Sequence, residues 1–306
     1  MNNVETVENE MSKDKNAVSD TVLEAGLVLE GGGMRGLYTA GVLDYFIDKG
    51  IYFKNCYGVS AGATQGCSYV SKQKGRAYRI FTKYMKDKRY ASFGNLLKEG
   101  NYFGKDFSLK KIPDELEPYD YDTFKNSGIN FYAVATNCRT GEAEYLKIDD
   151  MRKEVDMDKV WASCSLPLLS KNVHIEDEEY LDGGVADSIP VVRAIKDGNK
   201  KVVLVLTRDI NYRKKPNKLI SAIKFKYRKY PKFVSVMEKR HSIYNKTLKR
   251  IEKLENEGKI FVIRPKSEVK IGRLEKDIKK MTDLYNAGYN EAKECFESLI
   301  KYLKSE

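Results

Sequence analysis

The sequence predicts an α/β protein with a mostly parallel central sheet and a mainly helical C-terminal region. Apolar runs typical of buried strands alternate with stretches at helical spacing through the first two thirds of the chain. After about residue 210, long amphipathic stretches dominate instead. We therefore expect a disordered acidic tail at 1–24, an α/β domain at 25–210 and a basic helical region at 211–306 packed on it.

The first elements follow one another in the order of a parallel sheet. An apolar run at 26–30 precedes a glycine-rich loop and a helix at 37–47, and a second strand at 51–60 leads directly into a helix at 61–70. Further strands are expected at 129–137, 179–182, 201–208 and 260–265. The segment 101–128 carries Pro and Gly, so we expect it to run irregularly over the surface.

Two apolar stripes predict the long helices of the C-terminal region. The first stripe consists of Phe233, Met237, Tyr244, Leu248 and Ile251. The second consists of Leu274, Ile278, Met281, Tyr285, Tyr289, Ala292, Phe296, Leu299 and Leu303. Each stripe occupies one helical face, so both helices are expected to pack on the α/β domain.

The positive charge of the chain is concentrated in one segment. The 306 residues carry a net charge of +11, and the segment 208–250 holds 15 Lys and Arg against two acids. Such a segment attracts polyanions or an anionic membrane surface, although a solvated helical face explains the same charges equally well. Because the segment contains no recognisable nucleic-acid-binding module, we do not expect nucleic acid as a partner.

Composition favours a globular protein of the cytoplasm. The sequence has no run of 18 apolar residues and no apolar stretch of signal-peptide type near its start. Its five cysteines are scattered and form no CxxC pair, which argues against a disulfide framework or a zinc site. Neither a metal nor a cofactor is expected.

The stretch GVSAG at 58–62 matches the G-x-S-x-G pattern of a nucleophile elbow. It follows a strand and opens a helix, and Gly58 and Gly62 leave room for a sharp turn. Ser60 would then lie exposed at the strand end, where its hydroxyl can attack an acyl carbonyl. The pattern is short, so a plain turn with a helix-capping serine remains an equal alternative.

A nucleophilic serine needs a base, and the two histidines are poor candidates. His241 lies in the basic helical stretch, and His174 lies in what reads as a charged hairpin. Asp182 is the better candidate, because it ends an apolar strand and precedes two glycines that leave its carboxylate uncrowded. An ordinary Asp-Gly-Gly turn is the alternative.

The loop GGGMRG at 31–36 also fits a dinucleotide-binding fingerprint. That interpretation requires an acid at the end of the next strand, and Ser60 is found there instead. A P-loop is excluded because no Gly-Lys-Ser/Thr follows. The remaining interpretation is an oxyanion hole in which successive glycine amides face one point, while Arg35 orients the loop or attracts an anionic substrate.

Taken in order, GGGMRG, GVSAG and the DGG at 182–184 resemble the motifs of the patatin-like phospholipase family, and ASCSLPLL at 162–169 is similar to the segment before its aspartate. The resemblance covers about residues 26–208. It implies a three-layer α/β/α fold and a Ser-Asp dyad that needs neither histidine nor metal. Its site residues would be Ser60 as nucleophile, Asp182 as base, and an oxyanion loop of Gly31, Gly32, Gly33, Arg35 and Gly36.

The expected function is therefore hydrolysis of acyl lipids, with phospholipids or lysophospholipids as substrates. The basic segment at 208–250 would hold the enzyme against the anionic inner face of the membrane. The alternative is a lipid- or membrane-binding regulator with little turnover on the same scaffold.

Overall fold

The computed structural model describes residues 20–305. Most of the expected tail at 1–24 lies outside this range, and its last residues belong to the first strand, which begins at Thr21. The strands are β1 Thr21–Leu29, β2 Ile51–Val59, β3 Asn130–Asn137, β4 Ala143–Ile148, β5 Val173–Ile175, β6 Glu178–Asp182, β7 Val202–Val205 and β8 Phe261–Ile263.

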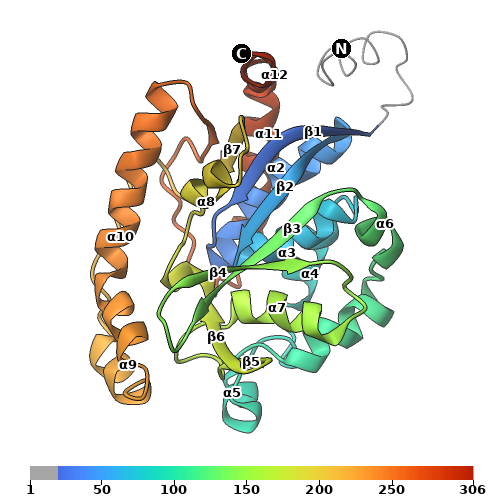
Figure 1. Cartoon of the computed structure of the whole chain (residues 1–306). Helices are drawn as coiled ribbons and strands as arrows, with labels where there is room; N and C mark the ends of the chain where they lie inside the picture. The colour runs from blue at the N-terminus through green and yellow to red at the C-terminus, as the bar shows by residue number, and fades with distance from the viewer. Residues whose placement is uncertain (1–19, 306) are drawn as a thin grey trace.

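Helices occupy most of the remaining described chain (Figure 1). The α-helices are α2 Gly36–Asp48, α3 Ala61–Val70, α4 Arg76–Tyr84, α5 Phe93–Glu99, α6 Tyr121–Asn126, α7 Glu154–Cys164, α8 Val191–Lys196, α9 Ile220–Lys226, α10 Pro231–Asn256, α11 Ile278–Glu294 and α12 Phe296–Lys304. The chain also contains two short 3-10 helices, η1 Gly33–Arg35 and η3 Gly183–Val185, and one π-helix, η2 Phe107–Leu116.

The strands form one mixed sheet in the order β5-β6-β3-β2-β1-β7-β8, with β4 paired to β3. The five strands β3, β2, β1, β7 and β8 are parallel to one another, as expected for crossover connections through helices. β4, β5 and β6 are antiparallel to the strands they pair with. The sheet is therefore mostly parallel, with an antiparallel end.

Three strands pair with β3, and two of them share one of its edges. β4 pairs along one edge of β3, from Phe131 to Thr136. β2 and β6 share the other edge: the β2 pairing ends at Val134 and the β6 pairing begins at Ala135. The end of β6 therefore lies directly beyond the end of β2.

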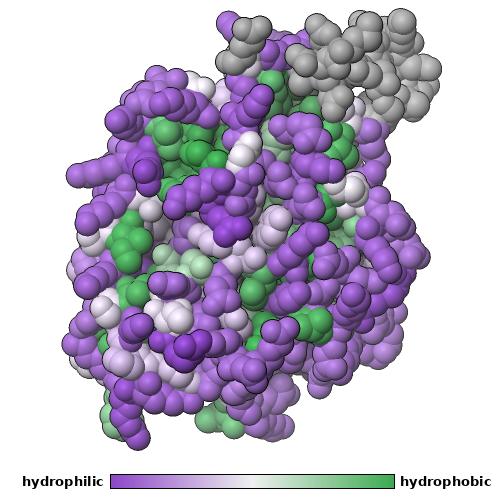
Figure 2. Space-filling view, in the orientation of Figure 1, coloured by the Kyte–Doolittle hydropathy of each residue, from purple (hydrophilic) through white to green (hydrophobic). Residues whose placement is uncertain are grey.

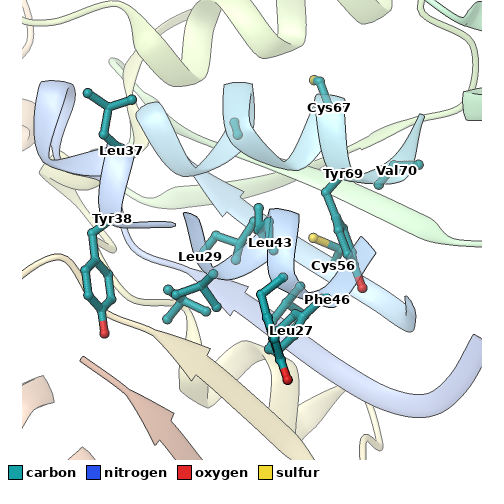
Figure 3. Packing of buried hydrophobic residues seen from close by; sticks show 14 of the residues in the cluster. Leu27, Leu29, Leu37, Tyr38, Leu43, Phe46, Cys56, Cys67, Tyr69 and Val70 are labelled. Carbon is teal, nitrogen blue, oxygen red and sulfur yellow. The ribbon is translucent and has the colours of Figure 1, made fainter. Parts of the chain in front are cut away.

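Helices cover both faces of the sheet and make a three-layer α/β/α sandwich. Side chains alternate along β1, so Leu27 and Leu29 pack with α2, α3 and α11, whereas Val28 faces α8 and α10. Figure 3 shows part of the first cluster, with Phe46 and Tyr69 reaching toward β1 and β2. The predicted fold class is confirmed.

The chain after residue 210 shares this sheet and core. The buried residues of α10 are the five predicted from its stripe, Phe233, Met237, Tyr244, Leu248 and Ile251. Leu274 lies in a turn before α11, and the rest of the second stripe is divided between α11 and α12, with Cys295 between the two helices. β8 extends the sheet beside β7, and α11 packs against α2. Among the described residues, no helix is both long and apolar enough to cross a bilayer.

Two parts of the fold differ from the sequence-based expectation. The segment 101–128 is largely helical, because η2 and α6 lie within it, and Ile112 and Phe124 bury their side chains in the core. The strand β4 was not predicted. β4 has few buried side chains, so it lacks the apolar run that marks the central strands. The predicted hairpin around His174 is present, as β5 and β6.

Candidate active site

Ser60 lies at the sharp turn between β2 and α3. Its backbone adopts φ +53° and ψ −121°, a strained conformation for a residue with a side chain. A Cβ added to Gly58 would lie 2.5 Å from Ala63 Cα, and one added to Gly62 would lie 2.4 Å from Leu29 O. Only glycine fits at these two positions, so the turn has the close packing expected of a nucleophile elbow.

The elbow is held by residues that precede β5 and β6 in the chain. The backbone N–H of Ser60 donates to Ser163 Oγ at 2.9 Å, and the Cys164 thiol donates to Ser60 O at 3.2 Å. Ser163 and Cys164 belong to the last turn of α7. The ASCSLPLL segment therefore holds the backbone of Ser60 through these two contacts.

Asp182 lies at the end of β6, opposite Ala135 of β3, whereas Val59 is opposite the preceding residue Val134. Because β6 is antiparallel, the carboxylate meets the carboxyl edge of the parallel strands from the opposite direction. The β6 strand reaches this position because it continues along the edge of β3 that β2 leaves free.

The Asp182 carboxylate is buried and only partly satisfied. Its Oδ1 accepts the Gly184 amide at 2.8 Å, whereas Oδ2 has no partner with full hydrogen-bond geometry among the described residues. Burial raises the pKa of Asp182, while the nearby Ser60 hydroxyl and then the Arg240 guanidinium act to lower it. The Ser60 hydroxyl is thus close enough to influence the carboxyl without a well-aligned hydrogen bond.

The glycine loop lies against the elbow. A Cβ on Gly31 would be 3.1 Å from Ser60 Cβ, and a Cβ on Gly32 would be 2.9 Å from Thr207 Oγ1. Gly33 has φ +59°, which favours glycine. Within the described chain, no hydrogen bond engages the backbone amides of Gly31, Gly32 or Gly33. The Gly36 amide differs from our expectation, because it donates to the carbonyls of Gly33 and Met34 inside its own turn.

Arg35 and Glu30 flank this loop inside the protein. Arg35 is 8% exposed, and its Nε has no hydrogen-bond partner among the described residues. Burial, followed by repulsion from Arg208 and Arg273, lowers the pKa of Arg35 to about 10. Glu30 is occupied by other donors: its carboxylate accepts the Thr207 amide at 2.7 Å and the Tyr244 hydroxyl at 2.6 Å.

Ser60 lines two cavities of opposite character. The first is apolar and is surrounded by α3, α4, η2 and α7, with side chains such as Phe81, Ile112 and Trp161 in its wall. The second is polar and contains the glycine loop, Asp182 and several cationic side chains. A substrate with an apolar chain and a polar end could therefore extend to both sides of the serine.

Sequence reasoning missed four cationic residues of the polar cavity, which are Arg208, Lys214, Arg240 and Arg273. A signal for Arg240 was present, because the stripe on α10 skips the helical turn between Met237 and Tyr244, where Arg240 is at the correct spacing. His241 and His174 line neither of the cavities that contain Ser60, as expected.

Comparison with known proteins is consistent with this geometry. The family model described as patatin-like phospholipase matches residues 27–195, and a domain of unknown function (DUF6363) matches residues 230–304. The first match covers more than half of the chain and contains the elbow, the glycine loop and Asp182.

The chain also resembles individual proteins, at low to moderate sequence identity. The chain is 31% identical to the uncharacterized protein YjjU of Escherichia coli (strain K12) over 186 residues, which are 59% of this chain and 51% of that protein. It is 26% identical to the probable lipid hydrolase 463L of Invertebrate iridescent virus 6 over 194 residues, 57% of this chain and 64% of that protein. The match thus spans only about half to two thirds of these relatives. VipD from Legionella pneumophila superposes with a TM-score of 0.46 at 15% identity, over 90% of this chain and 67% of that one.

Proposed function

The chain belongs to the patatin-like phospholipase family, and on this premise we propose that it is a serine hydrolase of acyl lipids, an esterase of the phospholipase or lysophospholipase type. The observation that carries the proposal is the place of Ser60, which lines both an apolar cavity and the polar cavity that contains Asp182. We further propose that residues 25–210 form the catalytic part and that residues 211–306 are packed on it as an accessory region.

In the proposed acylation step, Ser60 Oγ attacks the ester carbonyl carbon and its proton passes to Asp182 Oδ2, the carboxylate oxygen without a partner among the described residues. The carbonyl oxygen becomes negative and is stabilised by the free amides of Gly31, Gly32 and Gly33. The tetrahedral intermediate then collapses to an acyl-serine, and the alcohol leaves with the proton from Asp182.

Deacylation repeats these roles with water as the attacking group. Asp182 takes a proton from water, the hydroxide adds to the acyl carbonyl, and the fatty acid leaves as Ser60 recovers its proton. The pKa of Asp182, raised by burial, makes this carboxylate a stronger base than an exposed aspartate. Such a shift supports an aspartate acting without a histidine.

A direct test measures the hydrolysis of p-nitrophenyl acyl esters by Ser60→Ala and Asp182→Asn. Loss of a general base costs typically ~10²–10⁴ in rate, so both variants should lose at least that factor in kcat while remaining folded by circular dichroism. Ser221→Ala and Asp177→Asn, at exposed positions outside both cavities, are the matched controls. An active Ser60→Ala protein would exclude the proposal.

The alternative, a lipid-binding regulator without turnover, makes a different prediction for serine reactivity. A fluorophosphonate probe labels a serine only when a base and an oxyanion site activate it. Labelling that is abolished by Ser60→Ala favours the hydrolase. Absence of labelling, with lipid binding retained, favours the regulator.

We also propose that the enzyme acts at a membrane surface from the cytoplasmic side. The short helix α9 in the basic segment exposes Leu219 at its N-terminal end and Phe225 within it, at 59% and 74%, and Lys218, Lys224 and Lys226 are exposed beside them. A surface that combines apolar side chains with lysines is typical of a peripheral contact with anionic lipid.

A further inference from the structure

The polar cavity next to Ser60 has a strong excess of positive charge. Five cationic side chains line it, and they come from separate parts of the chain: Arg35, Arg208, Lys214, Arg240 and Arg273. Among the described residues, only two acids, Glu30 and Asp182, line the same cavity. Glu30 is already engaged by Thr207 and Tyr244, and Asp182 is the proposed base.

These cations are not balanced by ion pairs. Within residues 20–305, none of the five approaches a carboxylate oxygen within 4.0 Å, although cations elsewhere do so readily, as Arg79 and Lys83 do with Glu117. Arg240 Nε donates to the Gly184 carbonyl, and Arg208 Nη1 donates to the Val269 carbonyl at 2.9 Å. Neither contact neutralises a charge.

Two of the buried guanidinium nitrogens have no hydrogen-bond partner among the described residues. The Nε atoms of Arg35 and Arg208 are buried and unpaired in the part of the chain that the structure describes, and Arg35 is more than nine-tenths buried. A buried donor without an acceptor is costly, and a buried charge more so, unless a ligand satisfies it. The arrangement therefore has the properties of an anion site.

The pKa values of these cations also agree with an anion site. Burial and then repulsion from Arg273 lower the pKa of Arg240 to about 10. The pKa of Lys214 is lowered well below its ordinary value by burial and then by Arg240. An anion among the three side chains would oppose the lowering of both pKa values, because it supplies an opposite charge beside them.

We propose that this cavity binds the phosphate of an acyl-lipid substrate, so that the preferred esters are those that carry a phosphate group close to the scissile bond. This inference rests on the proposed hydrolase function. The acyl chain would occupy the apolar cavity and the phosphate the cationic one, with the ester at Ser60, which lines both. Arginine is suited to such a ligand because its planar donors match phosphate oxygens.

The residues that would select phosphate come largely from outside the segment that defines the family. The family match ends at residue 195, whereas Lys214, Arg240 and Arg273 follow it, and the last two lie in the domain of unknown function. We therefore assign to the C-terminal region the role of completing the substrate site with positive charge.

Binding can be measured without turnover in a Ser60→Ala background, by calorimetry with decyl phosphate and with decanol below their aggregation limits. Decyl phosphate should bind at least tenfold more tightly than decanol, and Lys214→Met or Arg240→Gln should each reduce the difference by on the order of tenfold, the usual effect of one charge-assisted hydrogen bond. Lys246→Met, an exposed position on α10, is the control and should change nothing.

Inorganic phosphate distinguishes a lipid headgroup from a free anion. If phosphate alone binds as tightly as decyl phosphate, the cavity is a site for a free anion and the substrate assignment is wrong. If decyl phosphate and decanol bind equally, the anion site itself is excluded. Lys214→Met keeps the test informative should Arg240→Gln fail to fold, since Lys214 lies in a loop and not in a helix.

Turnover gives a second, independent result. The ratio of kcat/KM for a monoacylglycerol phosphate to that for the corresponding monoacylglycerol should exceed about ten, and it should fall in Lys214→Met but not in Lys246→Met. If the unmodified enzyme hydrolyses both esters equally well, the phosphate inference fails and the hydrolase proposal stands. If neither ester nor any other acyl ester is hydrolysed, the hydrolase proposal fails, and the binding experiment alone decides the anion site.

Discussion

Burial of the Asp182 carboxyl controls when the proposed base is ionised. Burial raises its pKa, and Ser60, Arg240, the Gly184 amide and Arg273 act in the opposite direction. Since the carboxylate must be ionised to accept a proton, the acid limb of the kcat/KM profile should lie above the ordinary aspartate value of ~3.9. Arg240→Gln removes a charge that favours the carboxylate, so it should move this limb to higher pH. An unchanged limb in that variant would contradict the assigned base.

Burial of the ionised Asp182 carboxylate also lowers the stability of the folded protein, and a neutral residue at this position removes that cost. An acid whose pKa rises on folding keeps its proton in the folded state after the unfolded chain has lost it. Its contribution to stability therefore falls as pH rises from the unfolded value, 3.8, through the raised folded value, and the loss is complete above that value. Asp182→Asn should thus raise Tm at pH 7 and show a smaller gain near pH 4. Thermal unfolding between pH 4 and pH 8 measures this, with Asp177→Asn as an exposed control.

Ser163 supports the proposed nucleophile without being part of the proposed dyad. Its hydroxyl accepts the Ser60 amide at 2.9 Å in a fully buried position. Ser163→Ala leaves this N–H without a partner, which costs ~1–3 kcal/mol, so Tm should fall by several degrees. Because the elbow loses a restraint, kcat should fall more than KM changes. Ser221→Ala, at an exposed position, should leave both quantities as they are, and equal behaviour of the two variants would exclude a positioning role.

At the scale of elements, two glycines allow α2 and α11 to approach closely. A Cβ on Gly41 would be 2.1 Å from Tyr285 O, and a Cβ on Gly288 would be 2.0 Å from Tyr38 O. Such contacts are impossible without moving a backbone. The tyrosine hydroxyls add polar links between the helices, for example Tyr285 to Asp44 at 2.7 Å.

Gly288→Ala should therefore destabilise the protein although alanine is the better helix former. The propensity gain is ~1 kcal/mol, whereas overpacking costs typically ~1–3 kcal/mol and more when backbone must move, so the net effect is a loss. Denaturant unfolding measures it. Gly272→Ala, where no atom lies within 4 Å of the added carbon, is the matched control and should stay within ~0.5 kcal/mol of the parent. A stabilised Gly288→Ala protein would show that α11 does not pack as described.

The elements also show what a sequence can and cannot reveal. The stripe on α10 predicted its buried face, because burial on one side of a helix requires apolar residues at a fixed period. The motifs indicated that Asp182 approaches Ser60, but they could not indicate the route, since the approach depends on β6 pairing with β3 beyond the end of β2. The cationic cavity joins residues more than 200 positions apart, from Arg35 to Arg273, and no local pattern links them.

At the scale of the whole molecule, the most exposed apolar side chains lie on two short helices at one end. α5 exposes Phe93 and Leu97, at 66% and 88%, and α9 exposes Phe225 at 74%. Both helices lie at the lower end of the molecule in Figure 1, and Figure 2 shows hydrophobic atoms at that edge among hydrophilic ones. A surface with separate apolar side chains and many lysines can enter the interface of an anionic bilayer without a spanning helix.

Vesicle binding tests whether this end contacts lipid. Sedimentation with phosphatidylglycerol-containing vesicles should capture more protein than sedimentation with phosphatidylcholine alone, and added salt should reduce the difference, because each Lys or Arg near the surface contributes ~1 kcal/mol. Phe225→Ser should weaken binding about tenfold, since burying a phenylalanine is worth ~1.5–3 kcal/mol and the side chain enters only the interface. Ile195→Ser, on α8 and 40% exposed, should bind like the parent. If Phe225→Ser and Ile195→Ser behave alike, the contact does not involve α9, and the excess of lysines there serves only to keep that face solvated.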